Sequence, residues 1–153
     1  MSEIHESRDI LCPFEDVPRA AEHFLTTLPL ENGKRVIELH VTIGDLSVAR
    51  KADLELTPRS AFPTLKIMEI GWQPHDGGPY PTFHGTLSVE EIDGLFSRLD
   101  LDGTYEPPLG LAGLAFDAVL GHRLAVAAVR QLLSDLKLGF ELAYQTGMTV
   151  PAN

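Results

Sequence analysis

Apolar residues recur every three or four positions over a long run in the last third of the chain. The run covers residues 116–142 and contains few charged residues. This spacing is typical of an α-helix that buries one broad face. At about 1.5 Å per residue the helix is roughly 40 Å long, so it needs an equally long apolar surface to pack against. Its apolar face carries Phe116, Leu120, Leu124, Ala127, Ala128, Leu132, Leu136 and Phe140.

The middle of the chain instead alternates apolar and polar residues, which is the pattern of strands with one buried face. Residues 35–43 show the alternation most regularly, and Gly44 with Asp45 predicts a hairpin turn after them. Short turns between successive strands favour antiparallel pairing, and no strand–helix–strand alternation indicates a parallel sheet. The strands predicted in this way cover residues 35–43, 46–56, 65–72, 83–89 and 95–105.

A short strand and a first helix are predicted before these strands. Residues 9–12 form the strand, which Pro13 ends. Asp16 is placed to cap the helix, Pro18 is tolerated in its first turn, and the helix is expected to end near Leu28. We found no linker or repeat that would divide the chain, so residues 1–153 are expected to form a single domain. The apolar side of the first helix carries Val17, Ala20, Ala21, Phe24 and Leu28.

Charge and cysteine content narrow the class of protein. The chain has 22 acidic and 12 basic residues and a net charge of −10. Such a surface repels phosphate groups, so we expect no nucleic-acid partner. Charged residues interrupt the apolar run near the C-terminus, and therefore no membrane insertion is expected. Cys12 is the only cysteine, and the N-terminus is too polar for a secretory signal. Both features favour a reducing, cytoplasmic location.

Glycine, proline and tyrosine residues occur at the junction between the last predicted strand and the long helix. Together with the element order, the segment 101–136 resembles the polyketide-cyclase/START-related superfamily, although no family within it is identified. The resemblance implies an α+β helix-grip fold, in which a curved antiparallel sheet of about six or seven strands wraps around a long C-terminal helix. A short helical segment follows the first strand. The residues that carry the resemblance are Gly103, Tyr105, Pro107, Pro108, Gly110, Gly113, Asp117 and Gly121, the first two as a Gly-x-Tyr turn.

The resemblance also implies a cavity between the sheet and the C-terminal helix, since a curved sheet does not close completely around a helix. The expected function is binding of a small apolar or aromatic molecule there, lipid-like or polyketide-like. Small residues of the helix, Ala125, Ala127 and Ala128, are compatible with a cavity or with close packing. Two alternatives remain: a cyclase or aromatase-type enzyme with acid–base residues in the same cavity, and a ligand-free interaction or regulatory protein. Whether the chain is an enzyme or forms a homodimer stays open.

Arg50 is the most specific candidate for contact with a ligand. It has the same parity as Ala52 and Leu54, so in a regular strand it faces the core, where an unpaired guanidinium is costly. A ligand carboxylate or phenolate that paired with the guanidinium would offset this cost. Alternatively, a bulge or the end of the strand turns it outward, or an acid such as Glu69 pairs with it. Tyr105 either presents its hydroxyl to a ligand or caps the core. The ligand-binding residues expected from the sequence are Arg50, Met68, Trp72, Tyr105, Phe116 and Leu124.

No motif for catalysis or metal binding is present. The six histidines lack the HxH and HExxH spacings of zinc sites, and His40 and His84 lie on polar strand faces where solvent exposure is the simpler interpretation. The serines lack the G-x-S-x-G frame of a nucleophile. We therefore expect no metal and no cofactor, and we assign no catalytic residue.

Overall fold

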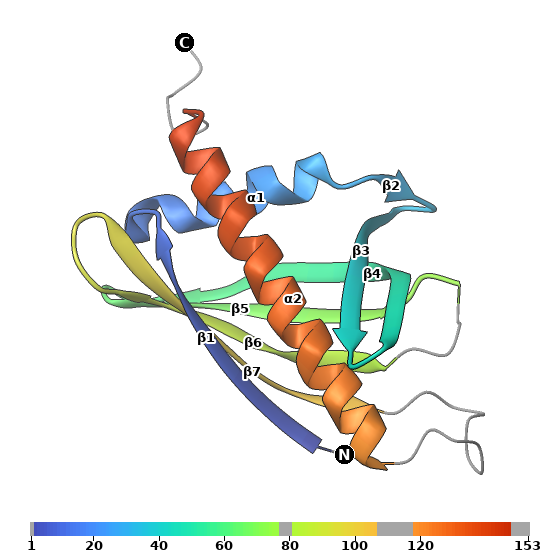
Figure 1. Cartoon of the computed structure of the whole chain (residues 1–153). Coiled ribbons are helices and arrows are strands. Elements are labelled where there is room, and N and C mark those ends of the chain that lie inside the picture. The colour runs from blue at the N-terminus through green and yellow to red at the C-terminus, as the bar shows by residue number, and fades with distance from the viewer. Residues whose placement is uncertain (1, 77–80, 107–117, 148–153) are drawn as a thin grey trace.

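A computed structural model describes residues 2–76, 81–106 and 118–147, and its main features are one curved antiparallel sheet and a long helix that crosses it (Figure 1). Seven strands follow the order β1-β7-β6-β5-β4-β3-β2. The predicted helix-grip architecture is confirmed. The elements are β1 (Ser2–Leu11), η1 (Phe14–Asp16), α1 (Val17–Thr27), β2 (Leu30–Glu31), β3 (Lys34–Ile43), β4 (Leu46–Ala61), β5 (Leu65–Pro74), β6 (Thr82–Glu91), β7 (Phe96–Glu106) and α2 (Ala118–Gln145).

The long C-terminal helix α2 buries the face that its sequence periodicity predicts. It packs most closely on β1, β3 and α1, so it lies diagonally between the two sides of the curved sheet (Figure 1). Burying each large apolar side chain contributes about 1.5–3 kcal/mol. Phe116 falls outside the described residues, as does the side chain of Leu120. The predicted positions that are buried are Leu124, Ala128, Leu132, Leu136 and Phe140, whereas Ala127 is partly buried.

Strand β1 is much longer than the predicted segment 9–12. It begins at Ser2 and pairs with β7 along its whole length, up to Leu11 opposite Phe96. The strand was not predicted over its full length because charged residues interrupt the alternation of apolar residues on its buried face. Glu6 lies on that face, where the side chain is 18% exposed and accepts a hydrogen bond of 3.1 Å from Arg130 of α2. At this position the hydrogen bond between Arg130 and Glu6 replaces the apolar contact that an alternating strand pattern would place against the helix.

Strand β4 continues beyond Leu56, where the prediction ended it. Proline has no N–H group to donate to a neighbouring strand, and it is tolerated within sheets at bulges and edges. Here the register between β4 and β5 shifts between Pro58 and Ser60, which places a bulge at this point. The strand therefore passes Pro58 and ends at Ala61, beside helix α1.

Two glycines face each other across β6 and β7. Gly85 is paired with Gly103, between the larger residue pairs Phe83–Tyr105 and Leu87–Leu101. A Cβ atom on Gly103 would lie 2.5 Å from Cζ of Phe83 and 2.6 Å from the backbone oxygen of His84. The close approach of the backbones explains both glycines. Gly103 and Tyr105 lie inside the regular strand β7, in agreement with the strand predicted over residues 95–105.

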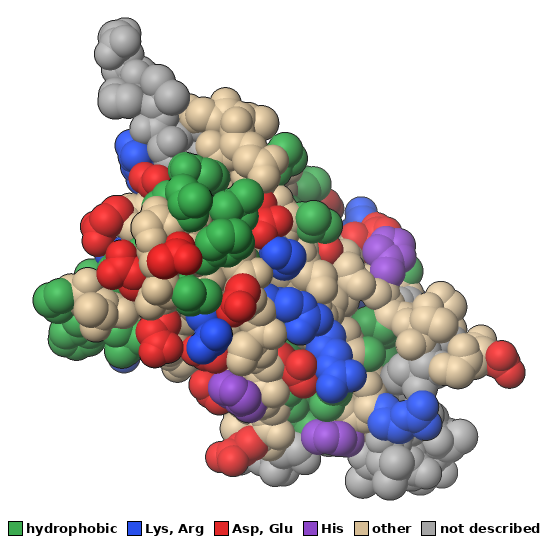
Figure 2. Space-filling model, turned by 60° about the vertical axis from the view of Figure 1, so that its left-hand side comes forward, with side chains coloured by type: hydrophobic (Ala, Val, Ile, Leu, Met, Phe, Trp, Pro, Cys, Tyr) green, Lys and Arg blue, Asp and Glu red, His purple; other side chains and the backbone are tan. Residues whose placement is uncertain are grey.

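Exposed apolar side chains gather at the end of the sheet that carries the β4–β5 and β6–β7 turns. They are Phe62, Ile92, Leu95 and Phe96, with exposed fractions of 40–54%. Figure 2 brings this end forward and shows hydrophobic side chains with acidic ones around them. Within the described ranges, no helix combines the length and apolar character needed to cross a membrane.

Candidate functional site

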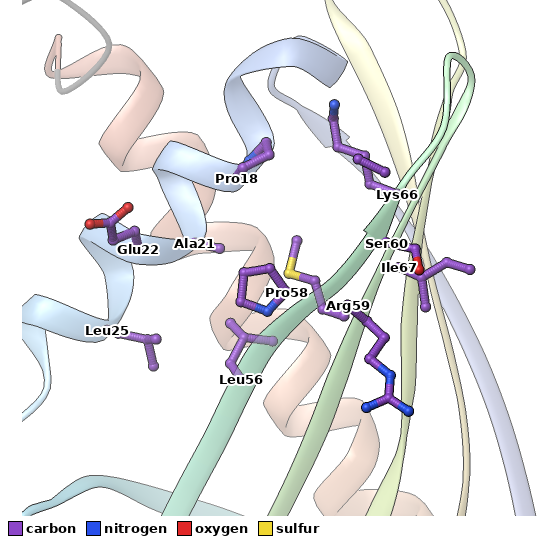
Figure 3. Close-up of a pocket in the computed structure, with 12 residues that line it drawn as sticks. Pro18, Ala21, Glu22, Leu25, Leu56, Pro58, Arg59, Ser60, Lys66 and Ile67 are labelled. Atoms are coloured by element: carbon purple, nitrogen blue, oxygen red, sulfur yellow. The ribbon is translucent and has the colours of Figure 1, made fainter.

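A groove of about 570 Å³ lies between helix α1 and the bulged end of the β4–β5 hairpin (Figure 3). We call it the α1 groove. Its wall is mostly apolar, and Figure 3 shows side chains from the helix and from β4 on opposite sides of the same space. Such a surface favours an apolar ligand. The apolar residues that line it include Pro18, Ala21 and Leu25 of α1, Leu56 and Pro58 of β4, and Met68 of β5.

Helix spacing and small side chains explain why the groove stays open. Pro18, Ala21 and Leu25 recur at three- and four-residue intervals, so they share one face of α1. Ala21 extends only a methyl group towards the groove. The helix itself is held from another side, where Phe24 packs edge-to-face on Phe140 of α2 with 6.0 Å between ring centroids. Because α2 fixes the position of α1, the helix does not need to close on the hairpin.

Lys66 places an ammonium group at the end of the groove nearest η1. Its side chain is only 12% exposed, and Nζ lies 4.2 Å from the centroid of the Phe14 ring. The carboxylate of Glu15 lies 3.8 Å away, but that side chain is 80% exposed. Arg59 also lines the groove, yet Figure 3 shows its guanidinium directed away from the central space, and it pairs with Glu69 at 3.2 Å.

Three of the predicted ligand residues, Met68, Trp72 and Tyr105, are buried on the sheet. Met68 is 3% exposed and reaches the α1 groove. Trp72 and Tyr105 belong to an aromatic row further along the concave face, where Phe83 lies between them in the strand register. The rings of Trp72 and Phe83 stack at 4.8 Å, and the Tyr105 ring lies 5.7 Å from that of His122 on α2. Met68 is therefore the predicted residue that reaches the groove.

The remaining predicted residues have different outcomes. Leu124 is buried on α2, and Phe116 lies outside the described residues. Arg50 is paired with Leu39, so it lies on the predicted face of the sheet, but its side chain is exposed. Of the orientations that the sequence left open for Arg50, the outward one is observed. Its Nη1 donates to the backbone oxygen of Ala49 at 3.0 Å, near the solvent-exposed end of the β3–β4 hairpin. Glu69, the alternative partner, pairs with Arg59 instead.

A histidine with two carboxylate partners was missed entirely. Nδ1 of His75 lies 2.5 Å from Oδ1 of Asp53, and Nε2 lies 3.4 Å from Oε1 of Glu31. The hydrogen bond with Asp53 raises the pKa of His75 above its usual value, although burial opposes this. The partners come from β2 and β4, and they are distant in sequence, so no local motif reveals the cluster. Across the described residues, no group of three or more potential ligands is arranged to hold a metal ion.

Replacing His75 with glutamine is expected to remove a pH-dependent part of the free energy of unfolding. Because the folded-state pKa of His75 is raised, the stabilisation is present in full below the unfolded-state value of about 6.5 and is lost as the pH rises through the folded-state pKa. The stability difference between the wild type and His75→Gln should therefore shrink as the pH rises from about 6 through the raised folded-state pKa.

Urea unfolding across that pH range measures this difference. His84→Gln is the matched control, because the structure gives the His84 ring no ion pair with a described residue. A difference between wild type and His75→Gln that stays constant with pH would contradict the assigned pairing.

Solved structures share this fold, although no family model and no curated protein sequence match the chain. A conserved protein from Geobacillus kaustophilus superposes with a TM-score of 0.59 at 15% identity, covering 95% of this chain and 97% of that one. The Zhui aromatase/cyclase from Streptomyces gives 0.53 at 13% identity, covering 95% and 94%. The di-domain aromatase/cyclase BexL gives 0.54 at 19% identity, covering 99% of this chain and 48% of that one. At these identities the likenesses show a shared fold, which is the helix-grip fold predicted from the sequence.

Proposed function

We propose that the chain binds a small apolar or aromatic molecule in the α1 groove. The observation that carries this proposal is the groove itself, an apolar hollow of about 570 Å³ between α1 and the β4–β5 hairpin. Its volume lies within the range of about 300–1,000 Å³ that is usual for small-molecule sites. The two aromatase/cyclases among the similar structures support a ligand of polyketide-like or lipid-like character.

The groove lies beside the region between the sheet and α2 where the sequence predicted an internal cavity. Deeper between the sheet and α2, several side chains have no accessible surface, so no space the size of a water molecule adjoins them. Met68 belongs to the concave face of the sheet and also lines the groove, so the proposed ligand rests partly on the predicted wall. The completely covered side chains include Leu99, Leu101, Leu132, Leu133 and Leu136.

Replacing Leu25 with tryptophan should block this site. Leu25 is partly buried and lines the groove from α1, so an indole ring there would occupy the space that a ligand needs. We expect the affinity for the neutral fluorescent probe N-phenyl-1-naphthylamine to fall at least about tenfold, which corresponds to about 1.4 kcal/mol. Titration of the probe, followed by its fluorescence increase, measures the change.

Leu142→Trp supplies the matched control for this experiment. Leu142 is 61% exposed on α2 and does not line the groove, so the same enlargement there should leave probe binding unchanged. Equal probe affinity in wild type and Leu25→Trp would place the bound probe elsewhere and refute the site.

A cyclase-type enzyme is the second candidate, and one contact favours it. Tyr105 and His122 bring a phenol and an imidazole together, with 5.7 Å between ring centroids, beside the stacked rings of Trp72 and Phe83. Such a pair can move a proton, and the exposed His122 gives a substrate access to one end of it. Incubation with a thioester-linked poly-β-ketone analogue, followed by product identification, tests this function directly. Recovery of the analogue with only its uncatalysed products would remove it.

A further inference from the structure

We propose that the molecule bound in the α1 groove is an amphipathic acid, whose single anionic group is held by Nζ of Lys66. This inference rests on the proposed function and adds the chemical class of its ligand. It starts from the Lys66 side chain, which is only 12% exposed and whose Nζ lies 3.8 Å from its ion-pair partner Glu15, beyond hydrogen-bond distance. A cation that is largely withdrawn from water and only loosely paired gains from an anionic ligand.

The protein holds the ammonium through one aromatic contact and one long ion pair. The ring of Phe14 lies 4.2 Å from Nζ, and this cation–π contact contributes about 0.5–1 kcal/mol or more. Glu15 is the nearest anion, but 3.8 Å is longer than a hydrogen bond, and its carboxylate is mostly in water. Exposed ion pairs of this kind contribute little to stability. The ammonium can therefore still donate hydrogen bonds to an anionic ligand.

The position of Lys66 sets the orientation of the ligand. Lys66 and Met68 are two residues apart on β5, so their side chains share the concave face of the sheet. The ammonium lies at the η1 end, while Met68, Leu56 and Ala21 form apolar walls further along. A carboxylate at Lys66 would therefore direct an aliphatic or aromatic tail along these walls. The sequence predicted an anion anchor at Arg50 on β4, whereas the structure assigns that role to β5.

Isothermal titration with decanoate and decanol tests this orientation, because the two probes share an apolar chain and differ in charge. Wild type should bind decanoate at least about tenfold more tightly than decanol, a difference of about 1.4 kcal/mol. Lys66→Met should bind the two probes equally and retain the wild-type affinity for decanol. That retained affinity shows that the variant has kept a folded groove.

Two further variants separate a local charge effect from a general one. Lys66→Arg keeps the charge and should keep a preference for decanoate. Arg59→Met removes the other cation that lines the groove, so a comparison with Lys66→Met shows which of the two holds the anionic group. Loss of the preference in Arg59→Met, with none in Lys66→Met, would overturn the assignment of Lys66.

The outcomes also distinguish this inference from the proposed function. Equal affinity of wild type for both probes, unchanged in Lys66→Met, would overturn the anionic class while leaving an apolar binding site. Failure of wild type to bind either probe, or N-phenyl-1-naphthylamine, would overturn the binding function and this inference together.

Discussion

Replacing Gly85 with alanine should destabilise the fold by about 3 kcal/mol or more, the upper part of the range for an added group that cannot be accommodated. A Cβ atom at this position would lie 2.1 Å from the backbone oxygen of Asp102 and 2.7 Å from Cα of Gly103. These are backbone atoms of the paired strand β7, so no side chain can rotate to relieve the contact. The β6–β7 pairing would have to separate locally.

Urea unfolding followed by far-UV circular dichroism measures the loss. Gly94→Ala is the matched control, because a Cβ atom there meets nothing within 4 Å. We expect that variant to remain within about 0.5 kcal/mol of wild type. If Gly85→Ala were equally stable, the two strands would not approach each other as closely as the structure shows.

Replacing Phe140 with alanine should cost about 3–5 kcal/mol, the usual range for a buried phenylalanine. Phe140 has no exposed surface, and its ring packs edge-to-face on Phe24. The neighbouring Gly139 lets Phe24 approach the helix backbone, since a Cβ atom there would lie 2.2 Å from Cδ1 of that ring. The truncation therefore leaves a cavity at the contact that positions α1.

Thermal and urea unfolding of Phe140→Ala test this expectation. The control is Leu138→Ala, two residues earlier on the same helix. Leu138 is 65% exposed, so its truncation should change the free energy of unfolding by less than about 0.5 kcal/mol. Similar losses in the two variants would mean that the Phe24–Phe140 contact does not hold α1 against α2.

Elements with regular patterns were predicted well, and elements with interrupted patterns were not. The alternation over residues 35–43 and the helical spacing over residues 116–142 correspond to β3 and to most of α2. Most of β1 was missed because Glu6 occupies its buried face, and the end of β4 was missed because a bulge accommodates Pro58. In each case a contact with a distant element replaced the local signal.

The site shows the same division. Met68 could be nominated from strand parity, because alternation alone places it on the buried face. Parity also placed Arg50 on that face, but it could not show that the core ends before reaching this residue. The signal for Lys66 was present in its shared parity with Met68 and the aromatic Phe14 upstream, although their contact depends on how η1 meets β5. His75, Asp53 and Glu31 meet only when three strands are assembled.

The sequence alone determined the type and approximate position of most elements, and the antiparallel sheet with its long terminal helix. It could do so because the repeats of 3.6 and 2 residues follow from backbone geometry within each segment. The tertiary structure alone decided where the core ends, where the groove opens and which charges meet. These features depend on strand register, on the bulge near Pro58 and on the position of α1 against α2, and each of them is set by several distant segments together.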